Sequence, residues 1–215
     1  MNTMRQQNAR IHKRTTKKGH PAADALDWNE AMGLIDNLVE DGYYRDAMLV
    51  ACGCFLGLRI SDILPLRWNQ ILSENGTLTL TEQKTGKMRT MKVNPRLREI
   101  ASVCYEHSHV RYKGSYIFTG QVFRESMPIT RQRADQILKE ARTRYGITSA
   151  KVFSTHTLRK TFGRRVWLQQ CERGRGDQAL QLLSEIYGHR HIYITKRYLG
   201  IRQEELLSVY GTLTD

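Results

Sequence analysis

The segment from Ala47 to Leu58 is the feature that most limits how this chain can fold. It is apolar on nearly every side of a helical projection, so a helix formed here has no face suited to water. Gly57 near its end is typical of a helix C-terminus, where a residue without a Cβ ends the regular conformation. The segment predicts a buried central helix, followed by Arg59 as a charge that emerges from the core.

Periodic patterns on both sides of this segment predict the elements that cover it. Residues 27–30 have the spacing of a capping box and open an amphipathic helix that extends to about Glu40. Two β-prone runs, 77–81 and 88–93, flank a polar tip and predict an antiparallel hairpin. Further helices are expected over residues 95–107, 130–145, 155–170, 177–187 and 202–210. The expected fold class is mainly α with a small antiparallel β-sheet (α+β).

The same patterns indicate which side chains form the interior. We expect core packing for Leu49, Val50, Phe55, Leu158, Phe162, Leu182, Leu183 and Ile186. The four cysteines form no C-x-x-C pair, which disfavours both a zinc ribbon and a disulfide framework. We therefore expect reduced thiols, most of them buried.

Positive charge is concentrated in two parts of the chain. The sequence has 34 Lys and Arg residues against 21 Asp and Glu, a formal net charge of +13. Residues 1–18 contain six basic and no acidic residues, and residues 111–175 contain 15 basic and 4 acidic residues. Such segregation favours a polyanionic partner, nucleic acid first, although a solvated basic surface would look the same.

The N-terminal region shows no helical or strand period. Residues 1–24 predict a flexible basic arm, and residues 25–215 predict one domain that ends in a tail helix at about 202–211. No apolar run approaches the length of a membrane span, and residues 1–18 lack the apolar stretch of a signal peptide. We expect a cytoplasmic protein without a membrane partner.

The segment His156-Thr157-Leu158-Arg159 is the first candidate for chemistry. Its spacing puts an imidazole and a guanidinium on one face of a predicted helix, near an N-terminus that favours anions. An H-x-x-R match is common, and a capping histidine beside a surface arginine explains it equally well.

Other segments change that interpretation. A G-L-R-x-S-D sequence spans residues 57–62, Lys84 lies in the predicted hairpin tip, G-H occupies residues 188–189, and T-x-x-Y-L occupies residues 195–199. In this order, together with H-x-L-R, they resemble the pattern of the tyrosine recombinase, or phage integrase, family. The resemblance covers the chain from about Asp27 to its end and implies that family's catalytic-domain fold, in a short form without the usual N-terminal core-binding domain.

The resemblance implies a role for each matching residue. Arg59 and Arg159 would grip the scissile phosphate of DNA, His156 and His189 would add hydrogen bonds, and Tyr198 would be the nucleophile. The product would be a 3′-phosphotyrosine link. Since a phenol has an ordinary pKa near 10, attack needs a proton acceptor, and His156 is the candidate general base.

The remaining roles fall to the hairpin and to an acidic residue. Lys84 would be the general acid for the leaving 5′-oxygen, with Lys87 as a substitute in the same turn, and Asp62 would brace the site. Two guanidiniums and imidazole donors can neutralise a pentacoordinate phosphate, and no clustered carboxylates for Mg²⁺ or nucleotide-binding loop accompany them. No cofactor is therefore expected.

The resemblance also implies partners. Double-stranded DNA is expected, with self-association on it into a tetrameric synapse, possible accessory DNA-bending proteins, and a nucleoid location. Weaker DNA contacts are expected from Arg10, Lys13, Arg14, Lys17, Lys18, Lys87, Arg173 and Arg175.

Alternatives remain open at this point. A type IB topoisomerase would use nearly the same side chains, and a DNA-binding regulator could keep the fold without catalysis. Tyr198 is one of ten tyrosines, and by composition alone such a residue is more often a packing residue than a nucleophile. The expected activity is site-specific DNA recombination, in integration, excision or inversion.

Overall fold

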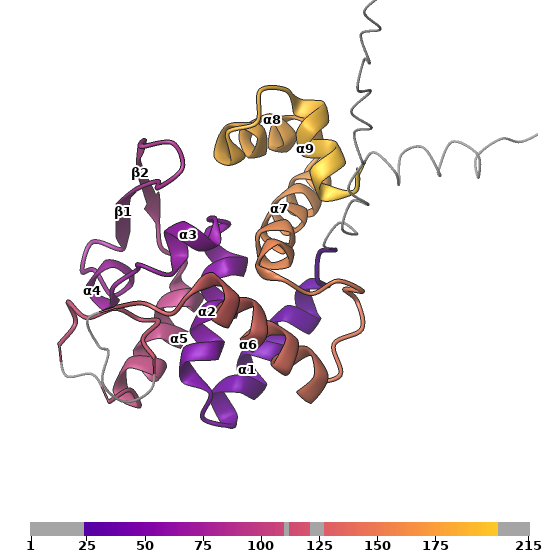
Figure 1. Ribbon diagram of the computed structural model, residues 1–215. Coiled ribbons are helices and arrows are strands. Elements are labelled where there is room, and N and C mark those ends of the chain that lie inside the picture. Colours follow the sequence, from indigo (N-terminus) through magenta and orange to yellow (C-terminus); the bar gives the residue numbers. More distant parts are fainter. Residues whose placement is uncertain (1–23, 110–111, 121–126, 202–215) are drawn as a thin grey trace, which may run out of the picture.

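The computed structural model describes residues 24–109, 112–120 and 127–201, and the chain is mainly helical there, with one small hairpin (Figure 1). The predicted arm, apart from residue 24, and the predicted tail helix lie outside the described residues. The elements are α1 Trp28–Glu40, α2 Tyr44–Leu56, α3 Ile60–Ile63, α4 Trp68–Ile71, β1 Thr77–Thr81, β2 Met88–Lys92, α5 Pro95–Glu106, α6 Arg131–Arg144, α7 Thr155–Cys171, α8 Gly176–Tyr187 and α9 Ile192–Leu199. The prediction of an α+β fold is confirmed.

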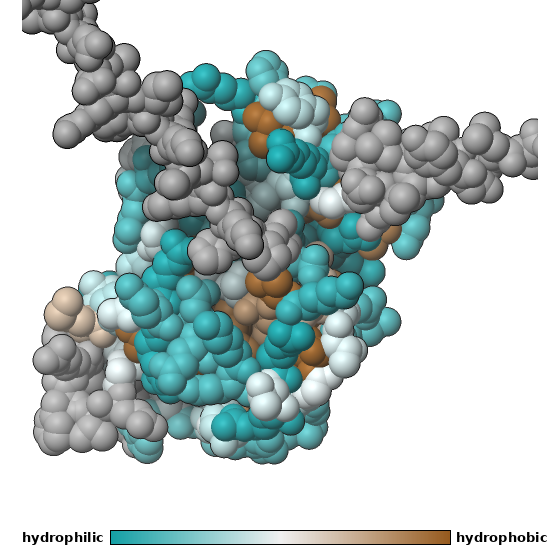
Figure 2. All heavy atoms as spheres, turned by 45° about the vertical axis from the view of Figure 1, so that its right-hand side comes forward, coloured by the Kyte–Doolittle hydropathy of each residue, from teal (hydrophilic) through white to brown (hydrophobic). Residues whose placement is uncertain are grey.

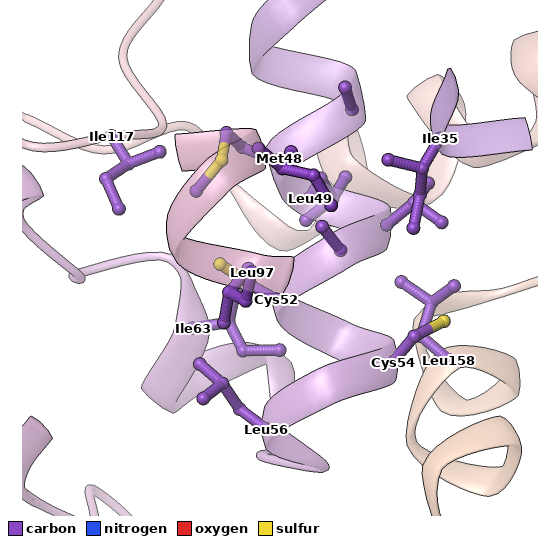
Figure 3. Packing of buried hydrophobic residues seen from close by; sticks show 14 of the residues in the cluster. Ile35, Met48, Leu49, Cys52, Cys54, Leu56, Ile63, Leu97, Ile117 and Leu158 are labelled. Carbon is purple, nitrogen blue, oxygen red and sulfur yellow. The ribbon is translucent and has the colours of Figure 1, made fainter. Parts of the chain in front are cut away.

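Helix α2 is the buried centre that its composition predicts. Its side chains are buried on every face (Figure 3): the cluster around it includes Ile35 of α1, Leu97 of α5 and Leu158 of α7. Gly57 ends the helix in the left-handed conformation, with φ 58°. A helix enclosed in this way gives the residues at its C-terminal end a fixed position.

The first helix is capped differently from the capping-box prediction. The Asp27 carboxylate accepts hydrogen bonds from the backbone of Asn29 at 2.8 Å and of Glu30 at 3.2 Å, as an N-cap should. The Glu30 carboxylate does not complete the box, because it binds the backbone N–H groups of Thr148 and Ser149 at 3.0 and 3.3 Å. It therefore ties the loop before α7 to α1.

The hairpin predicted from the two β-prone runs is present. Thr77 pairs with Lys92 and Thr81 with Met88, so residues 82–87 form the connection. The connection is polar, as predicted, but Glu82 at its start is only 8 % exposed. Its partners lie outside the hairpin, which explains the burial.

A second, smaller hydrophobic cluster joins the end of α7 to α8 and α9. Its buried members are Leu180, Leu183, Tyr187, Leu199 and Ile201, and Phe162 and Ile186 pack against it. Helix α7 takes part in both clusters and so connects the C-terminal helices to the main body (Figure 1).

The core prediction for Leu182 is wrong, because this side chain is 56 % exposed on α8. With Ile192 and Tyr193 of α9 it belongs to the large apolar side chains that reach the surface. Hydrophilic residues cover most of the face in Figure 2, and hydrophobic ones emerge in small patches.

The thiol prediction is confirmed, and no membrane helix is found in the described part. Cys52, Cys54 and Cys104 are buried free thiols, and Cys171 is exposed. Burial raises the pKa of the Cys104 thiol to about 12, so it stays protonated.

Among the described residues, no helix combines the length and apolar character that crossing a membrane requires.

Two glycines on different helices give opposite predictions for an added methyl group. A Cβ at Gly53 would lie 2.5 Å from the Leu158 Cβ, where α2 and α7 approach each other, whereas a Cβ at Gly33 of α1 meets nothing within 4 Å. We expect Gly53→Ala to lower the free energy of unfolding by roughly 1–2 kcal/mol through overpacking. We expect Gly33→Ala to raise it by about 0.5–1 kcal/mol through helix propensity. Urea unfolding checks both, and two shifts of the same sign would contradict the packing described here.

Candidate active site

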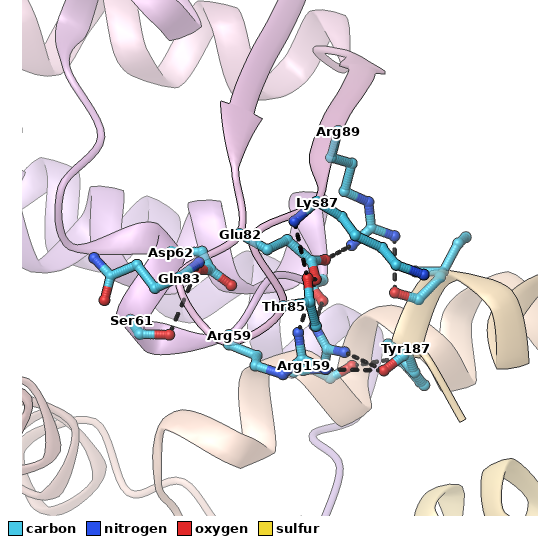
Figure 4. A network of polar contacts seen from close by, with 12 residues as sticks. Arg59, Ser61, Asp62, Glu82, Gln83, Thr85, Lys87, Arg89, Arg159 and Tyr187 are labelled. Carbon is cyan, nitrogen blue, oxygen red and sulfur yellow. Dashed lines mark hydrogen bonds and ion pairs between the residues drawn. The ribbon is translucent and has the colours of Figure 1, made fainter. Parts of the chain in front are cut away.

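Three arginines from different parts of the chain meet at the C-terminal end of α8 (Figure 4). The Tyr187 carbonyl accepts hydrogen bonds from Arg59 at 3.0 Å and from Arg159 at 3.5 Å, and the Ile186 carbonyl accepts one from Arg89 at 2.8 Å. Carbonyls in the last turn of a helix have no intrahelical partner, and this end of the helix is partly negative. The end of α8 therefore attracts guanidiniums and holds them together.

Each arginine reaches this point for a local reason. Arg59 follows the left-handed Gly57 that ends α2, and it precedes α3. Arg159 lies in the second turn of α7, is 6 % exposed, and donates to the Gly57 carbonyl at 2.5 Å while stacking 4.3 Å from the Tyr187 ring centre. Arg89 lies on the half-buried face of β2. The proximity of Arg59 and Arg159 that the sequence predicts is thus present in the structure.

The carboxylate of Glu82 lies among these cations. It accepts hydrogen bonds from Arg59 at 3.2 Å, from Arg89 at 2.9 Å and from the Thr85 hydroxyl at 2.8 Å. Burial alone would raise the pKa of Glu82, but the Thr85 hydrogen bond and the two guanidiniums outweigh it and lower the pKa. Glu82 is therefore ionised at neutral pH.

The arginine cluster retains excess positive charge and unused donors. Burial lowers the pKa of the Arg159 guanidinium, and the charges of Arg59 and Arg89 lower it further, although arginine stays protonated. A guanidinium has five N–H donors, and Arg59 and Arg159 each use two on protein acceptors. The remaining donors and the like-charge repulsion both favour binding of an anion such as a phosphodiester.

Tyr198 lies on α9 beside this cluster. Its ring packs edge-on against Tyr187 at 5.4 Å and His189 at 5.6 Å between centroids. Its hydroxyl oxygen is buried and has no hydrogen-bond partner among the residues that the structure describes. Burial raises the pKa of the Tyr198 phenol, whereas the charge of Arg159, a weak hydrogen-bonding interaction with that guanidinium and the charge of Arg59 oppose the shift without cancelling it. A neutral phenol is therefore held next to the guanidiniums.

His189 is placed by the turn that follows α8. Gly188 adopts the left-handed conformation with φ 67°, and the His189 N–H then bonds the Ser184 carbonyl at 2.9 Å. The His189 Nδ1 lies 2.9 Å from the Thr195 hydroxyl, which leaves Nε2 for another partner. Burial lowers the pKa of His189, and the charges of Arg159 and Arg59 lower it further. The imidazole is therefore neutral at pH 7.

The other two predicted catalytic residues lie at the edge of this arrangement. His156 is exposed in the first turn of α7, whose backbone at Thr155 donates to the Asp135 carboxylate of α6 at 3.2 Å. Partial burial lowers the pKa of His156, and the charge of Arg131 lowers it further. Lys84 is exposed in the hairpin turn. Within the described ranges, no hydrogen bond or ring contact joins either residue to Tyr198.

Asp62, for which the resemblance implies a bracing role, contacts the backbone of the hairpin turn. It is 3 % exposed, and its Oδ1 accepts the Gln83 backbone N–H at 2.8 Å. Gln83 directly precedes Lys84, so Asp62 fixes one side of the lysine-bearing turn to α3. Its Oδ2 is buried without a partner in the described part of the chain.

Several residues near the site were missed by the sequence analysis. Arg89 could have been recognised in the sequence, because it is a charged residue on the inward-facing side of a predicted strand. Nothing in the sequence distinguishes Glu82 from an ordinary solvent-exposed turn residue. Lys160 was also missed. It is 9 % exposed, and its ammonium lies 5.1 Å from the Tyr198 ring centre. Burial lowers the pKa of Lys160.

The weaker DNA-contact candidates are described only in part. Lys87, Arg173 and Arg175 are exposed, the last two in the turn between α7 and α8. The candidates from Arg10 to Lys18 lie outside the described residues. Across residues 24–109, 112–120 and 127–201, no group of three or more His, Cys, Asp or Glu side chains could hold a metal ion.

Comparisons with known proteins agree with this geometry. The family described as "Phage integrase family" matches residues 24–205. The probable integrase/recombinase YoeC of Bacillus subtilis (strain 168) is 34% identical over 166 residues, which cover 77% of this chain and 83% of that protein. The tyrosine recombinase XerA of Pyrococcus furiosus is 26% identical over 183 residues, 85% of this chain and 59% of that protein.

A solved structure shares the fold. The crystal structure of XerA recombinase superposes with a TM-score of 0.64 at 19% identity, over 90% of this chain and 66% of that one. The chain thus spans most of YoeC, but less than two thirds of the length of XerA. The expected catalytic-domain fold is confirmed.

The two lowered histidine pKa values predict how stability depends on pH. His156 and His189 both bind a proton less readily in the folded chain than at the ordinary pKa of 6.5. The unfolded chain then takes up more protons as the pH falls, so we expect the free energy of unfolding to decrease from pH 7.5 to pH 5.5. Imidazole NMR titration and urea unfolding measure the two effects. Midpoints at or above 6.5 for both rings would contradict this prediction.

Proposed function

The chain belongs to the phage integrase family of tyrosine recombinases, and from this premise we propose that it cleaves and rejoins double-stranded DNA at specific sites through Tyr198. The observation that carries the proposal is the convergence of Arg59, Arg159, His189 and Tyr198 around the end of α8. In chain order these side chains are separated by up to 139 positions, from 59 to 198, so their meeting is a property of the fold.

The proposed reaction exchanges one phosphate ester for another. The Tyr198 oxygen forms a bond to the scissile phosphorus while the bond from phosphorus to the deoxyribose 5′-oxygen breaks. The phenol loses its proton to a general base, and the leaving 5′-oxygen gains one from a general acid. The resulting 3′-phosphotyrosine retains the ester energy, so a second 5′-hydroxyl can attack it and rejoin the strands without a nucleotide cofactor.

Arg59 and Arg159 are the proposed phosphate ligands. Charge builds on the non-bridging oxygens in the pentacoordinate transition state, and preorganised guanidiniums stabilise it without reorganising. The carbonyls at the end of α8 and the carboxylate of Glu82 hold these donors in place before DNA arrives. His189 is proposed to donate to the same phosphate through Nε2.

His156 as general base and Lys84 as general acid remain predictions. Lys84 belongs to an exposed turn, and its long side chain would reach the leaving oxygen once DNA lies across the hairpin. His156 shares the early turns of α7 with Arg159, and the charge of that arginine acts on its pKa. The His189 ring packs against the phenol, but both its nitrogens are already assigned, Nδ1 to the Thr195 hydroxyl and Nε2 to the phosphate, so His156 is kept as the proposed base.

The domain arrangement and the partners complete the proposal. Residues 25–215 are proposed to form the catalytic domain, and residues 1–24 a basic arm that contacts DNA. Two solved relatives are named as XerH bound to its difH substrate, before and after cleavage. We propose that DNA binds this chain as well, that copies assemble into a tetramer on it through the C-terminal tail, and that the protein acts on the nucleoid with accessory bending proteins.

Covalent capture of DNA is the direct test. We expect the purified chain, incubated with nicked duplexes carrying a randomised core, to form a protein-linked strand that survives denaturing electrophoresis. Tyr198→Phe removes the nucleophilic oxygen and should abolish the adduct, whereas Tyr193→Phe, on the same helix but 64 % exposed, should leave it unchanged. Sequencing the captured strands identifies the preferred site.

Two outcomes separate this proposal from its alternatives. If the chain binds the nicked duplexes but forms no covalent adduct with any of them, the result would point to a non-catalytic DNA-binding regulator. Relaxation of supercoiled DNA that needs neither a preferred sequence nor a second, paired DNA site would point to a topoisomerase activity.

The basic arm predicts a salt dependence. Each phosphate neutralised by a Lys or Arg contributes about 0.9 to the slope of log affinity against log salt. Removing residues 1–18, which carry six basic residues, should make the slope shallower on a fluorescent duplex of the captured site. Titration between low and moderate salt measures it, and an unchanged slope would show that the arm makes no phosphate contact.

A further inference from the structure

The Glu82 carboxylate lies where a negative charge is hardest to accommodate. It touches Arg59, a proposed phosphate ligand, and both its oxygens are occupied: Oε1 by Arg89, and Oε2 by Arg59 and Thr85. A carboxylate beside a phosphate site repels the phosphate and uses donors that the phosphate could take. Its presence is therefore a disadvantage for binding alone, and a role in arranging the site would account for it.

The hydrogen bonds of Glu82 close the turn that carries Lys84. The Glu82 N–H donates to the Lys87 carbonyl at 2.9 Å, and the Gly86 N–H donates to the Glu82 carbonyl at 2.8 Å. The Thr85 hydroxyl, one residue after Lys84, bonds the Glu82 side chain at 2.8 Å. Glu82 thus holds the turn by its backbone and by its side chain at once, and Figure 4 shows its side chain among Arg59, Thr85 and Arg89.

Lys84 is anchored on both sides, although its own side chain is exposed. On one side, the Gln83 N–H bonds the Asp62 carboxylate at 2.8 Å. On the other, Thr85 is tied through Glu82 to Arg59. The Lys84 backbone therefore has a defined position relative to the guanidinium that would bind the phosphate, while its ammonium stays free to move.

We propose that Glu82 is a positioning residue: through Thr85 and Arg59 it sets the distance between the lysine-bearing turn and the bound phosphate, so that Lys84 reaches the leaving 5′-oxygen. The inference rests on the proposed function. Proton donation to a poor leaving group depends steeply on geometry, and a displacement of about 1 Å can cost on the order of a hundredfold in rate. The positive charge of Arg89, which pairs with Glu82 at 2.9 Å, offsets the negative charge that Glu82 places beside the phosphate site.

A substrate that needs no general acid separates this role from others. The captured DNA site is synthesised in two forms, with oxygen or with sulfur at the bridging 5′ position of the scissile phosphate. A thiolate leaves without a proton, so cleavage of the sulfur form is independent of Lys84. We expect Glu82→Gln to slow covalent cleavage of the oxygen form by about 10- to 100-fold and of the sulfur form by no more than about threefold.

Control variants fix the meaning of each outcome. Lys84→Ala should show the same rescue by sulfur, Arg59→Ala should be slow on both forms, and Glu99→Gln, an exposed acid on α5, should match the unaltered chain. Equal slowing of both forms by Glu82→Gln would overturn the inference, because Glu82 would then act on phosphate binding or on folding. Normal cleavage of both forms would overturn it as well.

A second variant keeps the test valid if Glu82→Gln fails to fold. Thr85→Val removes two hydrogen bonds from the turn, the one that the Thr85 hydroxyl donates to Glu82 and the one that it accepts from the Lys87 N–H at 3.3 Å, and it leaves both ion pairs of Glu82 in place. It should show the same sulfur rescue with a smaller loss of rate, and equal slowing of both forms would contradict the inference. Absence of any adduct with the unaltered chain is a different result: it would overturn the proposed function, and this inference with it.

Discussion

The attraction between guanidiniums and the carbonyls at the end of α8 is the interaction on which the site depends. Three arginines would repel one another in isolation, yet here they share the last turn of one helix. The free carbonyls and the negative end of the helix offset that repulsion. Gly188 makes the arrangement possible, because its left-handed conformation ends the helix and turns the chain towards His189.

The buried helix α2 supplies the fixed frame for this attraction. Because α2 is enclosed on every face, its C-terminal Gly57 is held firmly, and the Gly57 carbonyl accepts a hydrogen bond from Arg159. Arg59, two residues later, is therefore positioned by the same packing. Helix α7 packs on α2 through Leu158, the residue directly before Arg159. The packing of the core therefore also fixes where Arg159 lies relative to Arg59.

The sequence predicted correctly those features that depend on local patterns of residues, such as single helices and the hairpin, and on motifs with a fixed spacing. The all-round apolar character of 47–58 predicted the central helix, and two β-prone runs around a polar tip predicted the hairpin. It failed where tertiary contacts decide: α9 was not predicted as a helix, and Leu182, which fits an apolar stripe, faces solvent. Glu82 looks like any turn acid in the sequence, because the arginines that bury it lie 23 positions before it and 7 after it.

The state of Tyr198 in the absence of DNA follows from the same balance of burial and charge. Its hydroxyl is buried, makes no hydrogen bond of good geometry with a described residue, and interacts only weakly with the Arg159 guanidinium. Burial keeps the phenol neutral, and the guanidiniums and the Lys160 ammonium over its ring would stabilise a phenolate once the proton leaves. A phosphate bound to the arginines would give the hydroxyl an electrophile within the same small volume. Under the proposed function, the reactivity of this phenol would then depend on the binding of DNA.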